Sequence, residues 1–159
     1  MRYHNITKDD MLNGDGLRAV LWLAGCEHQC PGCQNPITWD PEGGIEFDEA
    51  AKAELFGILR RDYISGVTFS GGDPLAPYNA PEVEKLIDEI KESFPGKTIW
   101  IYTGYMWEEP KLSERYETPY ARLRFRCRLP SRRTHSPPCR EPDMDCRSFP
   151  RPNPSCAPD

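Results

Sequence analysis

Three short apolar runs alternate with two helical patterns, and this alternation constrains the fold more than any other feature of the sequence. The runs at 18–23, 66–70 and 98–102 have the length and the β-branched or aromatic content of buried strands. Each segment between two runs carries apolar residues at helical spacing. Strands separated by single helices form right-handed β-α-β crossovers and a parallel sheet. The sequence therefore predicts an α/β fold.

Both helical patterns have start and stop signals. Asp48 can cap the first helix, which we expect to end near Arg61. Pro81 lies near the start of the second helix, and Pro95 and Gly96 end it. The stripe residues are Phe47, Ala51, Leu55, Ile58 and Leu59 in the first helix and Val83, Leu86, Ile87, Ile90 and Phe94 in the second. Each stripe can cover one face of a sheet.

The composition changes near residue 118. Residues 1–118 hold 11 Lys and Arg against 21 Asp and Glu, a net charge of −10, and all 12 glycines. Residues 119–159 hold nine Arg, no Lys, nine Pro, four Cys and four Asp or Glu, a net charge of +5. We therefore expect a folded domain over 1–118 and an Arg/Pro-rich tail over 119–159.

The tail has too few large apolar residues to offset the entropy of ordering it. They are Leu123, Phe125, Leu129 and Phe149. We therefore expect the tail to be disordered. Three other interpretations stay open. The tail could be a basic arm that binds nucleic acid or an acidic partner, or the product of reading a GC-rich gene out of frame. It could also hold zinc through Cys127, Cys139, Cys146 and Cys156.

The overall charge and hydropathy argue against two classes of protein. The net charge of −5 is unfavourable for a general nucleic-acid-binding protein. The longest apolar run, 19–26, is far shorter than the ~20 residues of a membrane span. No apolar secretion signal begins the sequence. We therefore expect a cytoplasmic protein that binds neither nucleic acid nor a membrane, with its seven cysteines as metal ligands or free thiols.

A loop with three cysteines follows the first predicted strand. Cys26, Cys30 and Cys33 form a C-x3-C-x2-C motif. A zinc site needs a fourth ligand, and the position of His28 between two of the cysteines does not favour it in that role. Three thiolates suit a 4Fe-4S cluster with one open iron, at which a substrate or cofactor can coordinate. Zinc and unliganded thiols remain the alternatives.

Unusual loops also follow the other two predicted strands. Gly71, Gly72 and Asp73 follow the second, and Thr103, Gly104 and Tyr105 follow the third. Glycines let a backbone approach a ligand closely, and the aspartate adds an acceptor for a cation. A simple turn explains the glycine pair equally well. Because the carboxyl ends of parallel strands share one edge of a sheet, we expect all three loops to converge on one site.

These motifs resemble those of the radical S-adenosylmethionine superfamily. NGDGLR at 13–18, GCEHQCPGCQNPITW at 25–39, SGGDPL at 70–75 and YTGY at 102–105 are similar to one family within it. That family activates anaerobic ribonucleoside-triphosphate reductase, a glycyl-radical enzyme. The resemblance implies a short, partly open parallel β/α barrel. The family continues with a further strand and a Gly-, Ser- and Asn-containing segment, which nothing after about residue 121 resembles.

The resemblance also implies roles for individual residues. The three cysteines of the motif would hold a 4Fe-4S cluster whose open iron is chelated by S-adenosylmethionine. The glycine pair would contact the methionyl amino group, and the backbone around the last cysteine would lie against the adenine. The implied cofactor-binding residues are Gly32, Cys33, Gln34, Gly71, Gly72 and Asp73.

The implied reaction is reductive cleavage of S-adenosylmethionine to a 5'-deoxyadenosyl radical. This radical takes hydrogen from one glycine in the large subunit of anaerobic ribonucleoside-triphosphate reductase, and a flavodoxin- or ferredoxin-like donor supplies the electron. Two other functions stay open. One is another radical S-adenosylmethionine enzyme, such as a different glycyl-radical activase or a deazaguanine synthase. The other is a non-catalytic iron-sulfur or zinc-binding module.

Overall fold

The structure, a computed structural model, describes residues 1–105 and 123–127. These residues form a mixed α/β fold. Its elements are β1 (Arg2–Asp10), β2 (Leu17–Leu23), the 3-10 helix η1 (Pro36–Thr38), β3 (Ile45–Glu46), α1 (Glu49–Leu59), β4 (Ile64–Gly71), α2 (Ala80–Ser93), β5 (Thr98–Thr103) and β6 (Leu123–Cys127).

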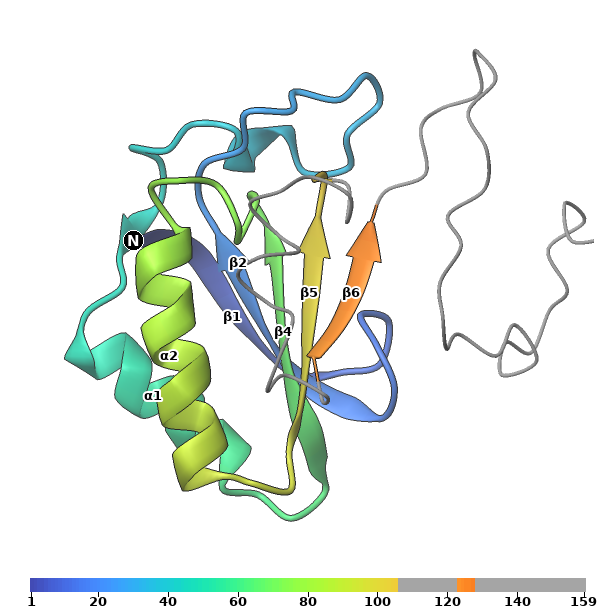
Figure 1. Cartoon of the computed structure of the whole chain (residues 1–159), viewed down its shortest axis with the longest axis vertical. Helices are drawn as coiled ribbons and strands as arrows, with labels where there is room; N and C mark the ends of the chain where they lie inside the picture. The colour runs from blue at the N-terminus through green and yellow to red at the C-terminus, as the bar shows by residue number, and fades with distance from the viewer. Residues whose placement is uncertain (106–122, 128–159) are drawn as a thin grey trace, which may run out of the picture. The chain divides into compact units, whose positions relative to one another are not determined.

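A six-stranded sheet with the order β3-β1-β2-β4-β5-β6 is the centre of the fold (Figure 1). β2, β4, β5 and β6 run parallel, so that Val20 lies opposite Thr68 and Phe69 lies opposite Ile101. This confirms the predicted α/β class and all three predicted strands. The sheet also contains β1, a strand that the sequence does not predict, which runs antiparallel to both β2 and β3.

Both helices cover the same face of the sheet (Figure 1). Asp48 caps α1 as predicted, because its Oδ1 accepts a hydrogen bond from the Ala51 N–H at 2.9 Å. Phe56 of α1 meets Phe94, just after α2, edge to face, with 5.4 Å between the ring centroids. None of the described helices is long and apolar enough to cross a membrane.

The core lies between these helices and the sheet. Alternate residues of the parallel strands, including Leu21 and Phe69, pack in one cluster with Leu55, Leu59 and Ile87 of the helices. All five are essentially inaccessible to solvent. Burying each such side chain contributes about 1.5–3 kcal/mol. This packing fixes the parallel strands, and with them the loops at their carboxyl ends.

The sheet also buries a charged side chain, Arg18. Its guanidinium donates five hydrogen bonds of 2.7–3.0 Å, which tie β2 to β4 and β5. The acceptors are Thr68 Oγ1, Thr98 Oγ1 and the carbonyl oxygens of Asp15, Val67 and Thr98. Burial lowers the pKa of Arg18 to about 10, so the side chain is charged at neutral pH.

β6 lies inside the segment for which the sequence predicts disorder. It pairs in parallel with β5, so that Ile99 lies opposite Leu123 and Thr103 opposite Cys127. These five residues are assigned to a strand within the segment for which the sequence predicts disorder. Without β6 the far edge of β5 would present unpaired backbone groups, and the sequence LRFRC alternates as strands do. The remainder of 119–159, with the alternatives proposed for it, lies outside the described residues.

Candidate functional site

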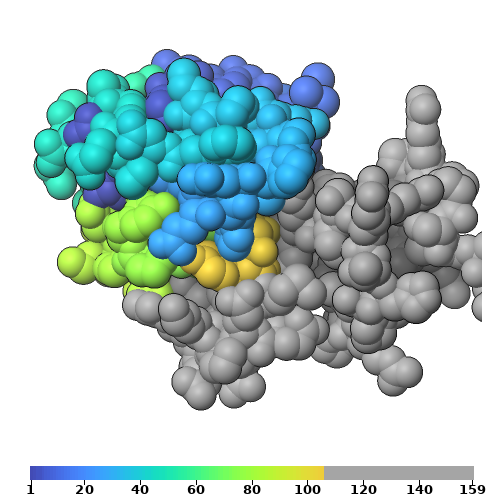
Figure 2. Space-filling view, turned by 90° about the horizontal axis from the view of Figure 1, so that it is seen from above, coloured from blue at the N-terminus to red at the C-terminus, as the bar shows by residue number. Residues whose placement is uncertain are grey.

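The loops after β2, β4 and β5 meet at the carboxyl edge of the parallel strands, as the sequence predicts. The Asp73 N–H donates to the Gly25 carbonyl, and the Gly72 N–H donates to the Leu23 carbonyl, both at 2.8 Å. The Gly104 N–H donates to Asp73 Oδ2 at 2.8 Å. Seen from above, the blue residues of the loop after β2 lie beside the yellow residues near the end of β5 (Figure 2).

The cysteine loop, residues 24–35, carries three partly buried free thiols. The Cys26 N–H donates to the Trp39 carbonyl at 3.1 Å, which fixes the start of the loop. The Cys33 N–H donates to the Cys30 carbonyl at 3.0 Å and closes a turn. The Asn35 N–H points at the sulfur of Cys33, 3.4 Å away. All three thiols therefore lie on one loop that backbone hydrogen bonds hold at its start and around Cys30 and Cys33.

The chemistry of these donors fits a 4Fe-4S cluster. Burial raises the pKa of the Cys26 thiol, and backbone hydrogen bonding from His28 and Gln29 acts in the opposite direction. N–H groups directed at sulfur are typical of cluster thiolates. In 1–105 and 123–127, however, no three Cys, His, Asp or Glu side chains are arranged to hold a metal ion. The structure thus places the three thiols on one loop, but among the described residues it does not bring them together as a set of metal ligands.

The glycine pair allows the loop after β4 to approach the cysteine loop. Gly71 has φ +88°, and a Cβ there would lie 2.9 Å from the carbonyl oxygen of Leu23. A Cβ at Gly72 would lie 2.9 Å from the carbonyl carbon of Ala24 and closer still to the oxygen of Gly25. Both glycines therefore have a packing role, and their contact with a cofactor stays a prediction.

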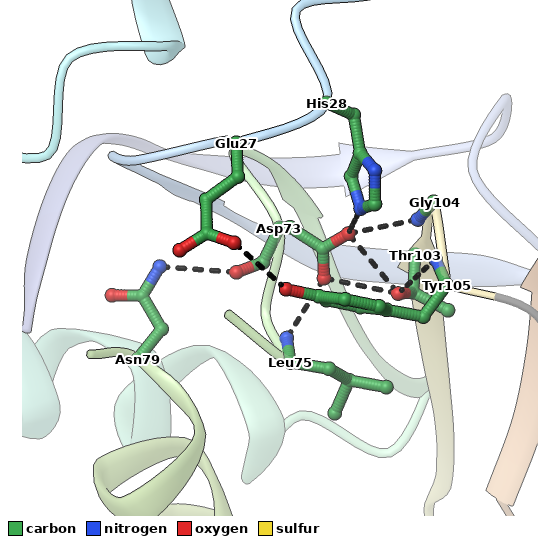
Figure 3. Close-up of polar contacts among 8 residues, drawn as sticks. All are labelled: Glu27, His28, Asp73, Leu75, Asn79, Thr103, Gly104 and Tyr105. Atoms are coloured by element: carbon green, nitrogen blue, oxygen red, sulfur yellow. Dashed lines mark hydrogen bonds and ion pairs between the residues drawn. The ribbon is translucent and has the colours of Figure 1, made fainter. Parts of the chain in front are cut away.

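Asp73 joins all three loops (Figure 3). This residue is only 3% exposed. Its carboxylate meets the Leu75 N–H at 2.9 Å, the Thr103 hydroxyl at 3.0 and 3.1 Å, the Gly104 N–H at 2.8 Å and His28 Nε2 at 2.9 Å. These partners are protein groups on three loops, and the predicted role of Asp73 toward a cation or cofactor stays a prediction.

His28 is the residue whose role the sequence does not reveal. Its ring lies edge to face with Tyr105, with 4.7 Å between the centroids and 73° between the planes. It also lies against Gly104, where a Cβ would be 2.8 Å from His28 Cγ. Because Nε2 contacts Asp73, that nitrogen does not supply the fourth ligand that a zinc site would need.

Tyr78 and Asn79, directly before α2, also hold the cysteine loop in place. The sequence patterns identify neither residue. Asn79 is 2% exposed, and its Nδ2 donates to the carbonyls of Ala24 and Asp73 at 2.9 and 3.1 Å. The ring of Tyr78 covers Gly25, leaving no room there for a Cβ. Burial raises the pKa of Tyr78 to about 12. The cysteine loop is thus held from the α2 side as well.

The other implied cofactor residues lie on the exposed side of the cysteine loop. Gly32 has φ +71°, and a Cβ there would meet no atom within 4 Å. Gln34 is exposed, and Cys33 between them is half-buried. Their contact with an adenine stays a prediction.

Comparisons with known proteins agree on one family. Residues 12–121 match the model of a 4Fe-4S single cluster domain. The chain is 43% identical over 114 residues to the anaerobic ribonucleoside-triphosphate reductase-activating protein of Enterobacteria phage T4. The aligned region covers 72% of this chain and 73% of that protein. The protein of that name from Escherichia coli K12 is 41% identical over 111 residues, 69% of this chain and 72% of its own length.

A third relative of that name, from Haemophilus influenzae, is 35% identical over 122 residues, 76% of this chain and 79% of its own length. The domain match spans the three loops that meet at the carboxyl edge. The family that the motifs predict is therefore confirmed: the chain belongs to the anaerobic ribonucleoside-triphosphate reductase-activating proteins and contains their 4Fe-4S domain.

Proposed function

We propose that this protein activates an anaerobic ribonucleoside-triphosphate reductase by generating a glycyl radical in its large subunit. One observation carries the proposal: in a chain of this family, the loop with three cysteines is hydrogen-bonded to the glycine-pair loop at the carboxyl edge of the sheet. The relatives are named for activating that reductase. The same edge is where parallel α/β folds bind their ligands.

In this proposal Cys26, Cys30 and Cys33 hold a 4Fe-4S cluster with one open iron. Reduced by one electron from a flavodoxin- or ferredoxin-like donor, the bound cluster would support reductive cleavage of S-adenosylmethionine, giving a radical that removes hydrogen from a glycine of the reductase. The protein's own part is to orient the cofactor. The backbone of Gly71 and Gly72 would face its methionyl end, with Asp73 beside them.

Residues of the cysteine loop would orient the other end of the cofactor. The backbone of Gly32, Cys33 and Gln34 would lie against the adenine, in the open space above Gly32. The buried junction of Asp73 and Asn79 beneath would exclude water from the inner side of the site.

We also propose that the sheet forms one wall of a partly open β/α barrel. The two crossovers, β2-α1-β4 and β4-α2-β5, place their helices on the same face of the sheet (Figure 1). The parallel strands follow each other as β2-β4-β5-β6 without a reversal of order. Doubly wound sheets instead reverse their strand order and carry helices on both faces, so the described order favours the barrel.

We place the protein in the cytoplasm, because free thiols that bind a cluster need a reducing compartment. An iron-sulfur module without catalysis, or another radical S-adenosylmethionine enzyme, is the competing function. A module with no cofactor to bind would not need an open iron.

Anaerobic reconstitution tests the proposal. We expect about four irons per chain, formation of 5'-deoxyadenosine with reductant and S-adenosylmethionine, and a glycyl-radical signal on adding the reductase. Replacing Cys26, Cys30 or Cys33 with Ala should remove the cluster, whereas Cys139→Ala, outside the motif, should keep it.

The outcomes separate the competing functions. Iron-loaded protein that forms no 5'-deoxyadenosine would favour the non-catalytic module. Formation of 5'-deoxyadenosine without a glycyl radical in the reductase would favour another substrate. Loss of the cluster in Cys139→Ala would contradict the assignment of three ligands and an open iron.

A further inference from the structure

We propose that His28 is a positioning residue that fixes the cysteine loop, through Asp73, against the loops that follow β4 and β5. The inference rests on the proposed function only in assuming that the loop carries a cluster. It assigns to His28 neither a ligand role nor a part in the chemistry. What His28 would set is the place and mobility of the cysteines on either side of it.

The ends of the cysteine loop are held by backbone hydrogen bonds. Gly25 N–H donates to the Thr38 carbonyl at 2.8 Å, and Cys26 N–H donates to the Trp39 carbonyl at 3.1 Å. The middle of the loop has a different attachment. There the His28 side chain reaches across 45 positions of sequence to Asp73 Oδ2 at 2.9 Å.

Asp73 is a rigid anchor for this contact. Its carboxylate is buried and already meets the Leu75 and Gly104 N–H groups and the Thr103 hydroxyl. An ionised carboxylate only accepts, so His28 Nε2 donates to it. Hydrogen bonds to a buried, charged and otherwise satisfied acceptor are short and directional. The imidazole is therefore held at one angle.

Neighbouring groups confine the ring further (Figure 3). Tyr105 contacts it edge to face, and Gly104 leaves no space between its own backbone and the ring. Tyr105 is itself bound to the cysteine loop, because its hydroxyl donates to Glu27 Oε2 at 3.3 Å. The loop after β5 and the cysteine loop are thus packed against each other at His28.

The position of His28 in the motif gives this contact its consequence. The residue lies between Cys26 and Cys30, two positions from each. Turning or releasing the side chain would move the backbone that carries both cysteines. Removing a contact that orients metal ligands from outside the coordination sphere typically changes metal affinity about 10–100-fold.

The test compares four single variants and one double variant of the full chain. His28→Phe keeps a ring but removes the donor, His28→Gln keeps a donor, and Asp73→Asn removes the charge of the acceptor. The matched control is Gln29→Asn, at an exposed position of the same loop whose φ of +40° asparagine tolerates. Each protein is measured metal-free by amide hydrogen exchange of the cysteine loop and, after reconstitution, by the rate of iron removal with a chelator.

We expect His28→Phe to load iron like the parent but to release it about tenfold faster, with faster exchange of the metal-free loop. His28→Gln should bring the rate of iron release and the exchange of the metal-free loop part of the way back to the parent values. Gln29→Asn should match the parent in both measurements. Because His28 and Asp73 act through one contact, the double variant His28→Phe with Asp73→Asn should be no faster than the quicker single variant.

Three results would overturn the inference. His28→Phe could behave like Gln29→Asn in both measurements. The double variant could show the product of the two single effects. His28→Phe could also bind no iron while its metal-free loop exchanges like the parent, which would make His28 a ligand. If His28→Phe does not fold, Asp73→Asn, which weakens the same contact from the acceptor side, provides the same two readouts. Parent protein that forms no 5'-deoxyadenosine would contradict the proposed function but leave this inference, which rests on loop exchange and iron release, intact.

Discussion

Gly72 shows how a single residue can decide whether two loops meet. A Cβ at this position would lie 2.9 Å from the carbonyl carbon of Ala24 and still closer to the Gly25 oxygen, directly before the first cysteine. We therefore expect Gly72→Val to displace the cysteine loop, to lower the iron content after reconstitution and to cost about 1–3 kcal/mol of stability. Iron analysis and thermal unfolding measure the two effects.

Gly96 supplies the control for this substitution, since a Cβ there meets no atom within 4 Å. Gly96→Ala should keep both the iron content and the melting temperature. If Gly72→Val loaded iron normally but no longer responded to S-adenosylmethionine, the glycine would serve the cofactor rather than the packing of the loops.

Arg18 is a second residue on which several elements depend. All five of its N–H donors are used, and its acceptors lie on β4, on β5 and in the turn before β2. Lysine has three donors, so Arg18→Lys would leave buried acceptors without partners. We expect a loss of about 3 kcal/mol in the free energy of unfolding, measured by urea denaturation.

An exposed arginine should tolerate the same change. Arg60→Lys, at the end of α1, should alter stability by less than about 0.5 kcal/mol. Equal stability of the two variants would mean that the buried hydrogen bonds of Arg18 contribute nothing beyond its charge.

At the scale of elements, α1 depends on its N-terminal cap. Asp48 Oδ1 accepts the Ala51 N–H at 2.9 Å, which satisfies one of the free donors of the first turn. We expect Asp48→Ala to destabilise the protein by about 1 kcal/mol, whereas Asp48→Asn should change stability little. Equal unfolding curves for the two variants would contradict a capping role.

Local patterns explain which elements the sequence predicts. β2, β4 and β5 are apolar runs, and α1 and α2 carry clear stripes, so short windows of sequence identify them. β1 and β6 are different. Among the nine residues of β1 only Tyr3 and Ile6 are buried, and β6 lies in a segment whose overall composition is dominated by Arg and Pro. β1 is held by pairing with β2 and β3, and β6 by pairing with β5, so neither strand shows itself in its own short window of sequence.

The candidate site divides in the same way. The three cysteines and the glycine pair belong to contiguous motifs, so the sequence by itself identifies them. The contact between His28 and Asp73 joins residues 45 positions apart, and no local pattern records it. Sequence predicts which loops converge, whereas the side chains that fasten them together emerge only from the tertiary structure.

At the scale of the whole molecule, the sheet order explains why the site needs most of the described chain. The parallel strands that carry the three loops are neighbours in the order β2-β4-β5, and β6 covers the free edge of the last one. The described residues belong to one compact unit, Met1–Leu129. The edge strand β6 is therefore expected to support the site although it carries none of its loops.

Two truncations test this expectation. A chain that ends at Leu129 keeps the whole compact unit, so it should retain its cluster and melt near the full-length temperature. A chain that ends at Ala121 lacks β6 and leaves the β5 edge unpaired. We expect it to be less stable by about 2 kcal/mol or more, because each lost backbone hydrogen bond contributes about 1 kcal/mol. Thermal unfolding and size-exclusion chromatography would show the lower stability and self-association through the exposed edge. Equal melting temperatures for the two truncations would mean that β6 does not stabilise the sheet, and loss of the cluster in the longer one would give residues 130–159 a role in holding it.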